Sequence, residues 1–162
     1  MATAEATIQT GATADSSNTG LWSWITTVDH KRIGILYGVT ALFWLVIGGL
    51  EALLIRVQLL KPENDFLSAD FYNQIFTMNG TTMIFLVGMP IAVAFFNYVI
   101  QRQIGVLDVA FPRLNALSYW IYFFGGIFIN VGFFLDAAPN MGWFGYAPLT
   151  SNTYSPGLNA DF

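Results

Sequence analysis

Two asparagines in the middle of the chain are the polar residues most open to a chemical role, because both lie in one long apolar run. Asn79 and Asn97 are 18 positions apart (97 − 79). This is five turns of an α-helix, so both are expected on one stripe, with Pro90 within about 20° of it. Polar groups in a membrane helix are costly unless they face protein or water. The stripe predicts either a polar path or hydrogen bonds between helices, and the spacing favours the hydrogen bonds.

Titratable side chains add few further candidates. Glu51 lies near the end of the first apolar run, where it could handle a proton or reach interfacial water, and the structural role is favoured. His30 is the only histidine and precedes that run, so we expect an interfacial residue rather than a ligand. The chain has no cysteine. These counts predict no metal site, iron–sulfur cluster, disulfide or bis-histidine haem from this chain alone.

The composition is that of a membrane protein. Of the 162 residues, 55% are hydrophobic and only 10% are charged, whereas soluble domains have roughly 25% charged residues. The shortage of charge therefore indicates a surface that faces lipid. The formal charge of −4 offers no basic surface to a polyanion, which sets nucleic-acid binding aside.

Three apolar runs, at about 33–57, 75–100 and 114–135, are long enough to cross a bilayer as helices. We therefore predict an all-α membrane protein with a three-helix transmembrane domain over residues 21–136. Residues 1–20 are small and polar without a signal-peptide pattern, and are expected to form a disordered tail. Residues 137–162 are rich in proline and glycine and are expected to form an outer-side loop laid against a partner.

Basic residues predict the orientation. Four of them flank the same side of the predicted bundle, and only Arg56 and Lys61 lie on the other. The positive side faces the cytoplasm, which places the N-terminus inside and the C-terminus on the outer, periplasmic side. The absence of a transit-like N-terminus favours a bacterial cytoplasmic membrane. The four residues on the positive side are Lys31, Arg32, Arg102 and Arg113.

Several long motifs resemble the start of subunit I of the haem-copper cytochrome c oxidases. They are VDHKRIG (28–34), GGLEALLIRVQLLKP (48–62), YNQIFTMNGTTMIFL (72–86), IGVLDVAFPRLNALSYW (104–120) and GWFGYAPLTS (142–151). The resemblance implies a fold like the first three helices of a twelve-helix bundle. In that family the bundle holds two haems and a copper, reduces oxygen to water and pumps protons. This chain is thus expected to be a shortened relative.

The resemblance also implies roles for individual residues. The family places a haem-ligating histidine in a Met-His-Gly sequence, and here Asn79 replaces it; a carboxamide is not among the usual haem ligands. Arg56 matches an arginine that contacts a haem substituent, which makes it a vestigial haem contact. Asp108 matches the entrance carboxylate of a proton channel. Asn97 and Asn115 match the polar lining of that channel.

Three functions are therefore open. The favoured one is a haem-free structural or accessory subunit, derived from oxidase subunit I, of a larger respiratory or electron-transfer complex. The alternative is an N-terminal fragment of a split catalytic subunit I that contributes the proton-channel entrance; a transient assembly factor is the third. In each case this chain alone binds no cofactor, and haem belongs to partner subunits. The expected partners are other integral membrane subunits and lipids.

Overall fold

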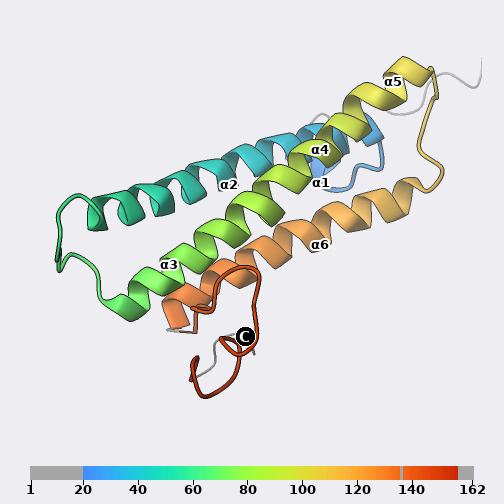
Figure 1. Ribbon diagram of the computed structural model, residues 1–162. Coiled ribbons are helices and arrows are strands. Elements are labelled where there is room, and N and C mark those ends of the chain that lie inside the picture. Colours follow the sequence, from blue (N-terminus) through green and yellow to red (C-terminus); the bar gives the residue numbers. More distant parts are fainter. Residues whose placement is uncertain (1–19, 136, 157–162) are drawn as a thin grey trace, which may run out of the picture.

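Three long helical rods run side by side and account for most of the chain (Figure 1). The computed structural model describes residues 20–135 and 137–156. Within them, three helices are long and apolar enough to cross a membrane: His30–Gln58, Ala69–Ile104 and Pro112–Leu135. Those residues include no strand. The predicted all-α membrane fold is confirmed, while the predicted tail falls almost wholly outside the described residues.

The first span, α2 (His30–Gln58), follows a short helix, α1 (Leu21–Ile25). Asp29 caps α2, because its side chain accepts a hydrogen bond from the Lys31 backbone N–H at 3.0 Å. At the far end the chain reverses through a turn held by two side chains. Asn64 donates to the Val57 carbonyl at 2.9 Å, and Gln58 accepts from the Leu67 backbone N–H at 2.8 Å.

The second span is a continuous rod in which α-helical and π-helical segments alternate. It consists of α3 (Ala69–Thr81), η2 (Thr82–Gly88), α4 (Met89–Phe95), η3 (Phe96–Ile100) and α5 (Gln101–Ile104), of which η2 and η3 are π-helical. Ser68 caps it by accepting from the Phe71 backbone N–H at 3.3 Å. Pro90 follows η2 and cannot donate a backbone hydrogen bond to the carbonyl four residues earlier, that of Leu86. Tyr122 of the third span supplies a hydroxyl to this carbonyl at 2.8 Å.

The third span consists of α6 (Pro112–Val131) and a short 3₁₀ extension, η4 (Gly132–Leu135). Two buried clusters join the spans: one is centred on Ile33, Tyr37 and Tyr119, and the other on Trp44, Leu86 and Val87. Gly126 is needed here, because a Cβ at this position would lie 2.9 Å from Cζ2 of Trp44. Small residues of this kind let membrane helices approach closely.

Residues 137–156 fold back along their own chain (Figure 1). The Gly142 backbone N–H donates to the Thr77 hydroxyl at 2.9 Å. The Trp143 ring packs on Gly80, where an added Cβ would lie 2.5 Å from the indole Cδ1. The sequence analysis expected this segment to lie on a partner. In the structure it contacts α3, because the hydroxyl of Thr77 and the bare backbone of Gly80 form its docking face.

Candidate functional site

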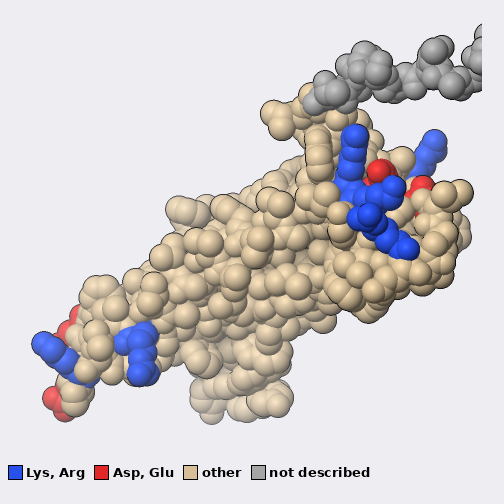
Figure 2. All heavy atoms as spheres, turned by 90° about the horizontal axis from the view of Figure 1, so that it is seen from above, with Lys and Arg blue, Asp and Glu red and all other residues tan. Residues whose placement is uncertain are grey.

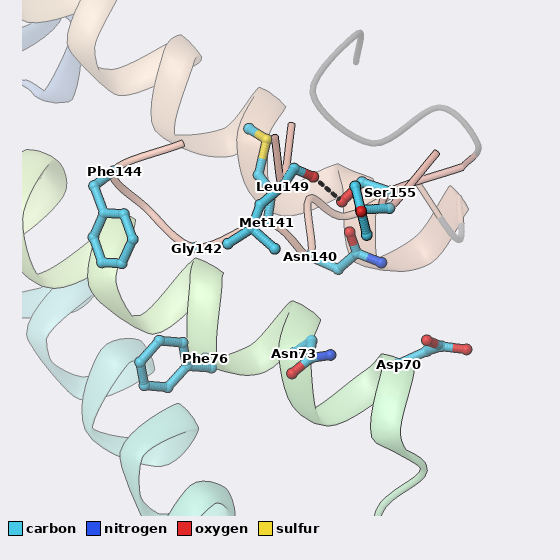
Figure 3. Close-up of a pocket in the computed structure, with 10 residues that line it drawn as sticks. Asp70, Asn73, Phe76, Asn140, Met141, Gly142, Phe144, Leu149 and Ser155 are labelled. Carbon is cyan, nitrogen blue, oxygen red and sulfur yellow. Dashed lines mark hydrogen bonds between the residues drawn. The ribbon is translucent and has the colours of Figure 1, made fainter. Parts of the chain in front are cut away.

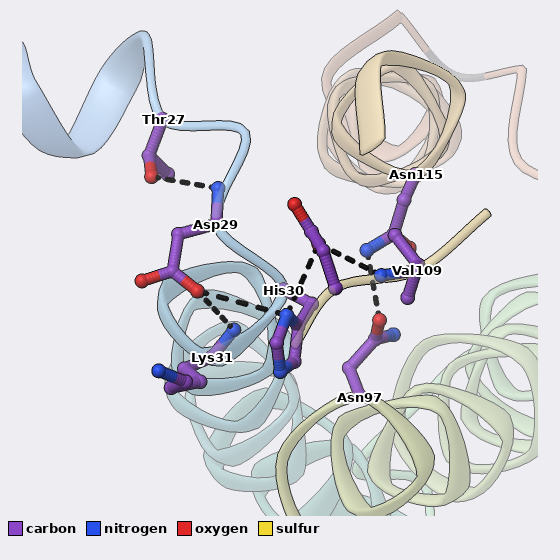
Figure 4. A network of polar contacts seen from close by, with 8 residues as sticks. Thr27, Asp29, His30, Lys31, Asn97, Val109 and Asn115 are labelled. Carbon is purple, nitrogen blue, oxygen red and sulfur yellow. Dashed lines mark hydrogen bonds and ion pairs between the residues drawn. The ribbon is translucent and has the colours of Figure 1, made fainter. Parts of the chain in front are cut away.

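A polar cluster closes the end of the bundle at which α2 begins and α5 ends (Figure 4). Asp108 lies in the loop after Gly105, which ends α5 in the left-handed conformation at φ 74°. Its Oδ1 accepts from the Val109 backbone N–H at 2.8 Å and lies 3.2 Å from Nδ1 of His30. The imidazole is 1% exposed, so the Asp108 carboxylate orients a buried ring at the start of α2.

Beside this pair, the two asparagines of the predicted channel lining touch each other (Figure 4). Asn115 of α6 donates from Nδ2 to Oδ1 of Asn97 in η3 at 2.8 Å. Asn97 is buried and donates in turn to the Val93 carbonyl at 3.0 Å. The structure thus brings Asp108, Asn97 and Asn115 to one end of the bundle. Among the described residues, Asp108 is hydrogen-bonded to His30 and Val109 rather than to either asparagine.

His30 is the functional candidate that the sequence analysis assigned to the interface alone. It is buried and bridges the first span to the Asp108 loop, 78 positions away in sequence. Only the adjacent Asp29 and Lys31 marked it as polar surroundings, and Asp29 Oδ1 lies 3.8 Å from its Nδ1. No local signal pairs a histidine with a carboxylate at such a separation.

Charge gathers at the two ends of the rods (Figure 2). The end with Asp108 carries four basic residues, and the opposite end carries Arg56 and Lys61, as the sequence grouping has them. Arg56 is exposed in the last turn of α2. The side of the membrane that each end faces stays a prediction. The four basic residues are Lys31, Arg32, Arg102 and Arg113.

Asn79, the position of the family's haem ligand, is used for helix contact. Its Nδ2 donates to the Gly48 carbonyl of α2 at 2.8 Å. Asn97 at the other end of the predicted stripe contacts α6 instead, because two π-helical segments intervene and a π turn holds more residues than an α turn. The described residues contain no group of three or more His, Cys, Asp or Glu side chains able to hold a metal. Position 79 therefore does not fit a haem iron.

Glu51 is more deeply placed than its position near the end of α2 suggested. It is 7% exposed, and its Oε2 has no hydrogen-bond partner. Its side chain lies beside Thr82 of η2, which is fully buried with an unpartnered hydroxyl. Gly48, one turn earlier, lets Thr82 approach α2 closely. Packing against the second span, not distance from the helix end, excludes Glu51 from water.

Comparison with known proteins identifies the relatives of this bundle. The family model described as "Cytochrome C and Quinol oxidase polypeptide I" matches residues 32–160. The chain is 54% identical over 139 residues to cytochrome c oxidase subunit 1 of Bacillus subtilis. It is 49% identical over 143 residues to quinol oxidase subunit 1 of the same species. It is also 48% identical over 142 residues to the haem-copper oxidase subunit I+III of Aeropyrum pernix.

These matches cover most of this chain and a small part of each relative. They include 86%, 88% and 87% of the chain, in the same order. They include 22%, 22% and 17% of the relatives. The chain thus spans about a fifth of the length of the curated relatives that it matches.

Proposed function

Because this chain belongs to the cytochrome c and quinol oxidase polypeptide I family, we propose that it is a haem-free structural subunit of a larger membrane complex of respiratory electron transfer. One observation carries the proposal. The side chain at the family's haem-ligand position, Asn79, donates its amide hydrogen to the Gly48 carbonyl at 2.8 Å. Haem iron is held by His, Met, Cys or Tyr, so this position serves helix packing.

Other polar side chains inside the bundle have the same role. They hydrogen-bond from one span to another, and such bonds between membrane helices contribute about 0.6 kcal/mol each, up to about 2. A polar stripe that is consumed by such bonds needs no substrate or cofactor to satisfy it. The pairs are Tyr37–Ser118, Thr40–Tyr119, Asn97–Asn115 and Tyr122–Leu86.

The outer faces of the spans favour membrane partners. Large apolar side chains on each rod stay exposed, among them Val46 at 64%, Phe96 at 57% and Ile121 at 65%. Such surfaces need lipid or the helices of other integral subunits. The family is one of multi-subunit membrane oxidases, so we propose integral subunits of an electron-transfer complex as the partners, with any haem bound there.

The test is to purify the complex through a tag on this chain and to measure its haem content. Co-purifying subunits are identified by mass spectrometry, and haem is quantified from reduced-minus-oxidised spectra. We expect Asn79→Leu to leave the haem content per complex and the haem spectrum unchanged. Loss of one haem from the Asn79→Leu complex would refute the proposal. Recovery at equal stoichiometry with a polypeptide that supplies the remaining helices of one subunit I would also refute it.

A second function is favoured by the cluster at the other end. In a split catalytic subunit I, Asp108 would take up protons, and the hydrogen-bonded Asn97 and Asn115 would line the path inward. The exposure of the Asp108 side chain, 46%, supports this role, because an entrance carboxylate must reach water.

Proton uptake separates the two functions. In the purified complex, Asp108→Asn is compared with Asp65→Asn, which removes an exposed carboxylate at the opposite end. A channel entrance predicts that only Asp108→Asn slows proton uptake during turnover, by ten-fold or more if the carboxylate acts as an acid–base group. Equal rates for both variants would exclude it.

A further inference from the structure

We propose that the apolar pocket at the start of the third span binds an anionic phospholipid, whose headgroup pairs with Arg113. The pocket is a cavity of about 460 Å³ between the loop before α6 and the linker before α2. Apart from the arginine its lining residues are apolar. They are Val28, Ala110, Phe111, Pro112, Arg113 and Leu114.

The depth of the pocket fits the boundary between acyl chains and headgroups. It opens at the first residues of the span Pro112–Leu135. On its other side lies Val28, three residues after α1. Leu21 and Trp22 of α1 are 84% and 66% exposed, and tryptophan is enriched where membrane meets water. A pocket flanked by these elements faces lipid rather than bulk water.

Arg113 is the arginine at this end that is free to bind an anion. Arg32 lies over the Trp24 ring at 5.5 Å and contacts Ser23. Arg102 donates to the Tyr98 hydroxyl at 3.1 Å and lies over its ring. Arg113, by contrast, is exposed and has no hydrogen bond or ion pair among the residues that the structure describes.

The two halves of the site select an amphiphile of negative charge. A guanidinium pairs with phosphate through two parallel hydrogen bonds, and the surrounding basic side chains raise the local concentration of anions (Figure 2). Inorganic phosphate would satisfy the arginine but leave Phe111, 72% exposed, and Leu114, 62% exposed, in contact with water. The acyl chain of a phospholipid covers both. A zwitterionic lipid gains less, because its own cation opposes Arg113.

Native mass spectrometry of the full chain with its co-purifying partners tests the site. Phosphatidylglycerol and phosphatidylcholine with the same acyl chains are titrated separately, and inorganic phosphate is added as a competitor. The variants are Arg113→Gln and the matched control Arg102→Gln, which removes a charge at the same end. Circular dichroism confirms that both remain helical.

We expect wild type to prefer phosphatidylglycerol and phosphate to compete poorly. Arg113→Gln should weaken the phosphatidylglycerol affinity about five-fold, the factor that corresponds to about 1 kcal/mol for one basic residue at an anionic surface. Arg102→Gln should change it less than two-fold. Equal losses in the two variants would mean diffuse charge attraction and overturn the site. Equal binding of the two lipids, or displacement by phosphate, would overturn it as well. These outcomes are independent of whether the chain binds haem.

Discussion

The Asn79 side chain and the Gly48 carbonyl form a hydrogen bond of 2.8 Å between the first and second spans. This single contact binds the position of the family's haem ligand to a neighbouring backbone. It also places a polar atom pair inside an otherwise apolar interface, where the loss of the donor is measurable.

Asn79→Leu should lower the free energy of unfolding in detergent or bicelles by about 1 kcal/mol, because one hydrogen bond between membrane helices is lost. Asn130→Leu is the matched control. Asn130 donates to the Gly126 carbonyl at 2.9 Å within its own helix, so its loss leaves the helix contacts in place. A destabilisation by Asn79→Leu no larger than that by Asn130→Leu would contradict the prediction.

Tyr122→Phe should destabilise the bundle by about 1–3 kcal/mol, because it leaves the Leu86 carbonyl, which Pro90 cannot satisfy, without a partner. The measurement is a double-mutant cycle with Pro90→Ala, read by reversible unfolding. Alanine at position 90 restores a backbone N–H, so Tyr122→Phe should cost less in that background. The same loss with and without the proline would show that the hydroxyl does not compensate for Pro90.

Gly126→Ala should destabilise the bundle by about 1–3 kcal/mol through overpacking, since its methyl group would lie 2.9 Å from Trp44. The neighbouring Gly125→Ala is an ideal comparison, because a Cβ there meets nothing within 4 Å. It should be neutral or slightly stabilising. Thermal unfolding of the two variants gives the answer, and Trp44→Phe should partly rescue Gly126→Ala. Similar behaviour of the two alanine variants would count against the Trp44 contact.

Thr77→Val should loosen residues 137–156, because the hydroxyl that accepts from the Gly142 backbone N–H is removed. Faster amide exchange of this segment, by several-fold at Gly142, is the expected result. Thr81→Val serves as the control, since Thr81 bonds only to the Thr77 carbonyl one turn earlier. Exchange in 137–156 that is unchanged by Thr77→Val would mean that Trp143 alone holds the loop.

Hydropathy and spacing were sufficient for the three spans, because crossing a bilayer demands long apolar helices whatever their neighbours. They could not show that His30 meets Asp108, since nothing local encodes a contact across 78 positions. They also could not show that Glu51 is buried, because its exposure depends on how closely Thr82 approaches at Gly48. Helical periodicity put Asn79 and Asn97 on one face, and the π-helical segments between them made that geometry inapplicable.

Those π-helical segments have a consequence for chain length. Each π turn holds about one residue more than an α turn, so η2 and η3 behave as insertions that the rod has absorbed. Deleting one residue within η2 would rotate everything after it by about 100° around the helix axis. Pro90 would leave the side of the rod that Tyr122 serves, and Asn97 would turn away from Asn115. The second span should therefore tolerate many substitutions on its outer face but no change of a single residue in its length.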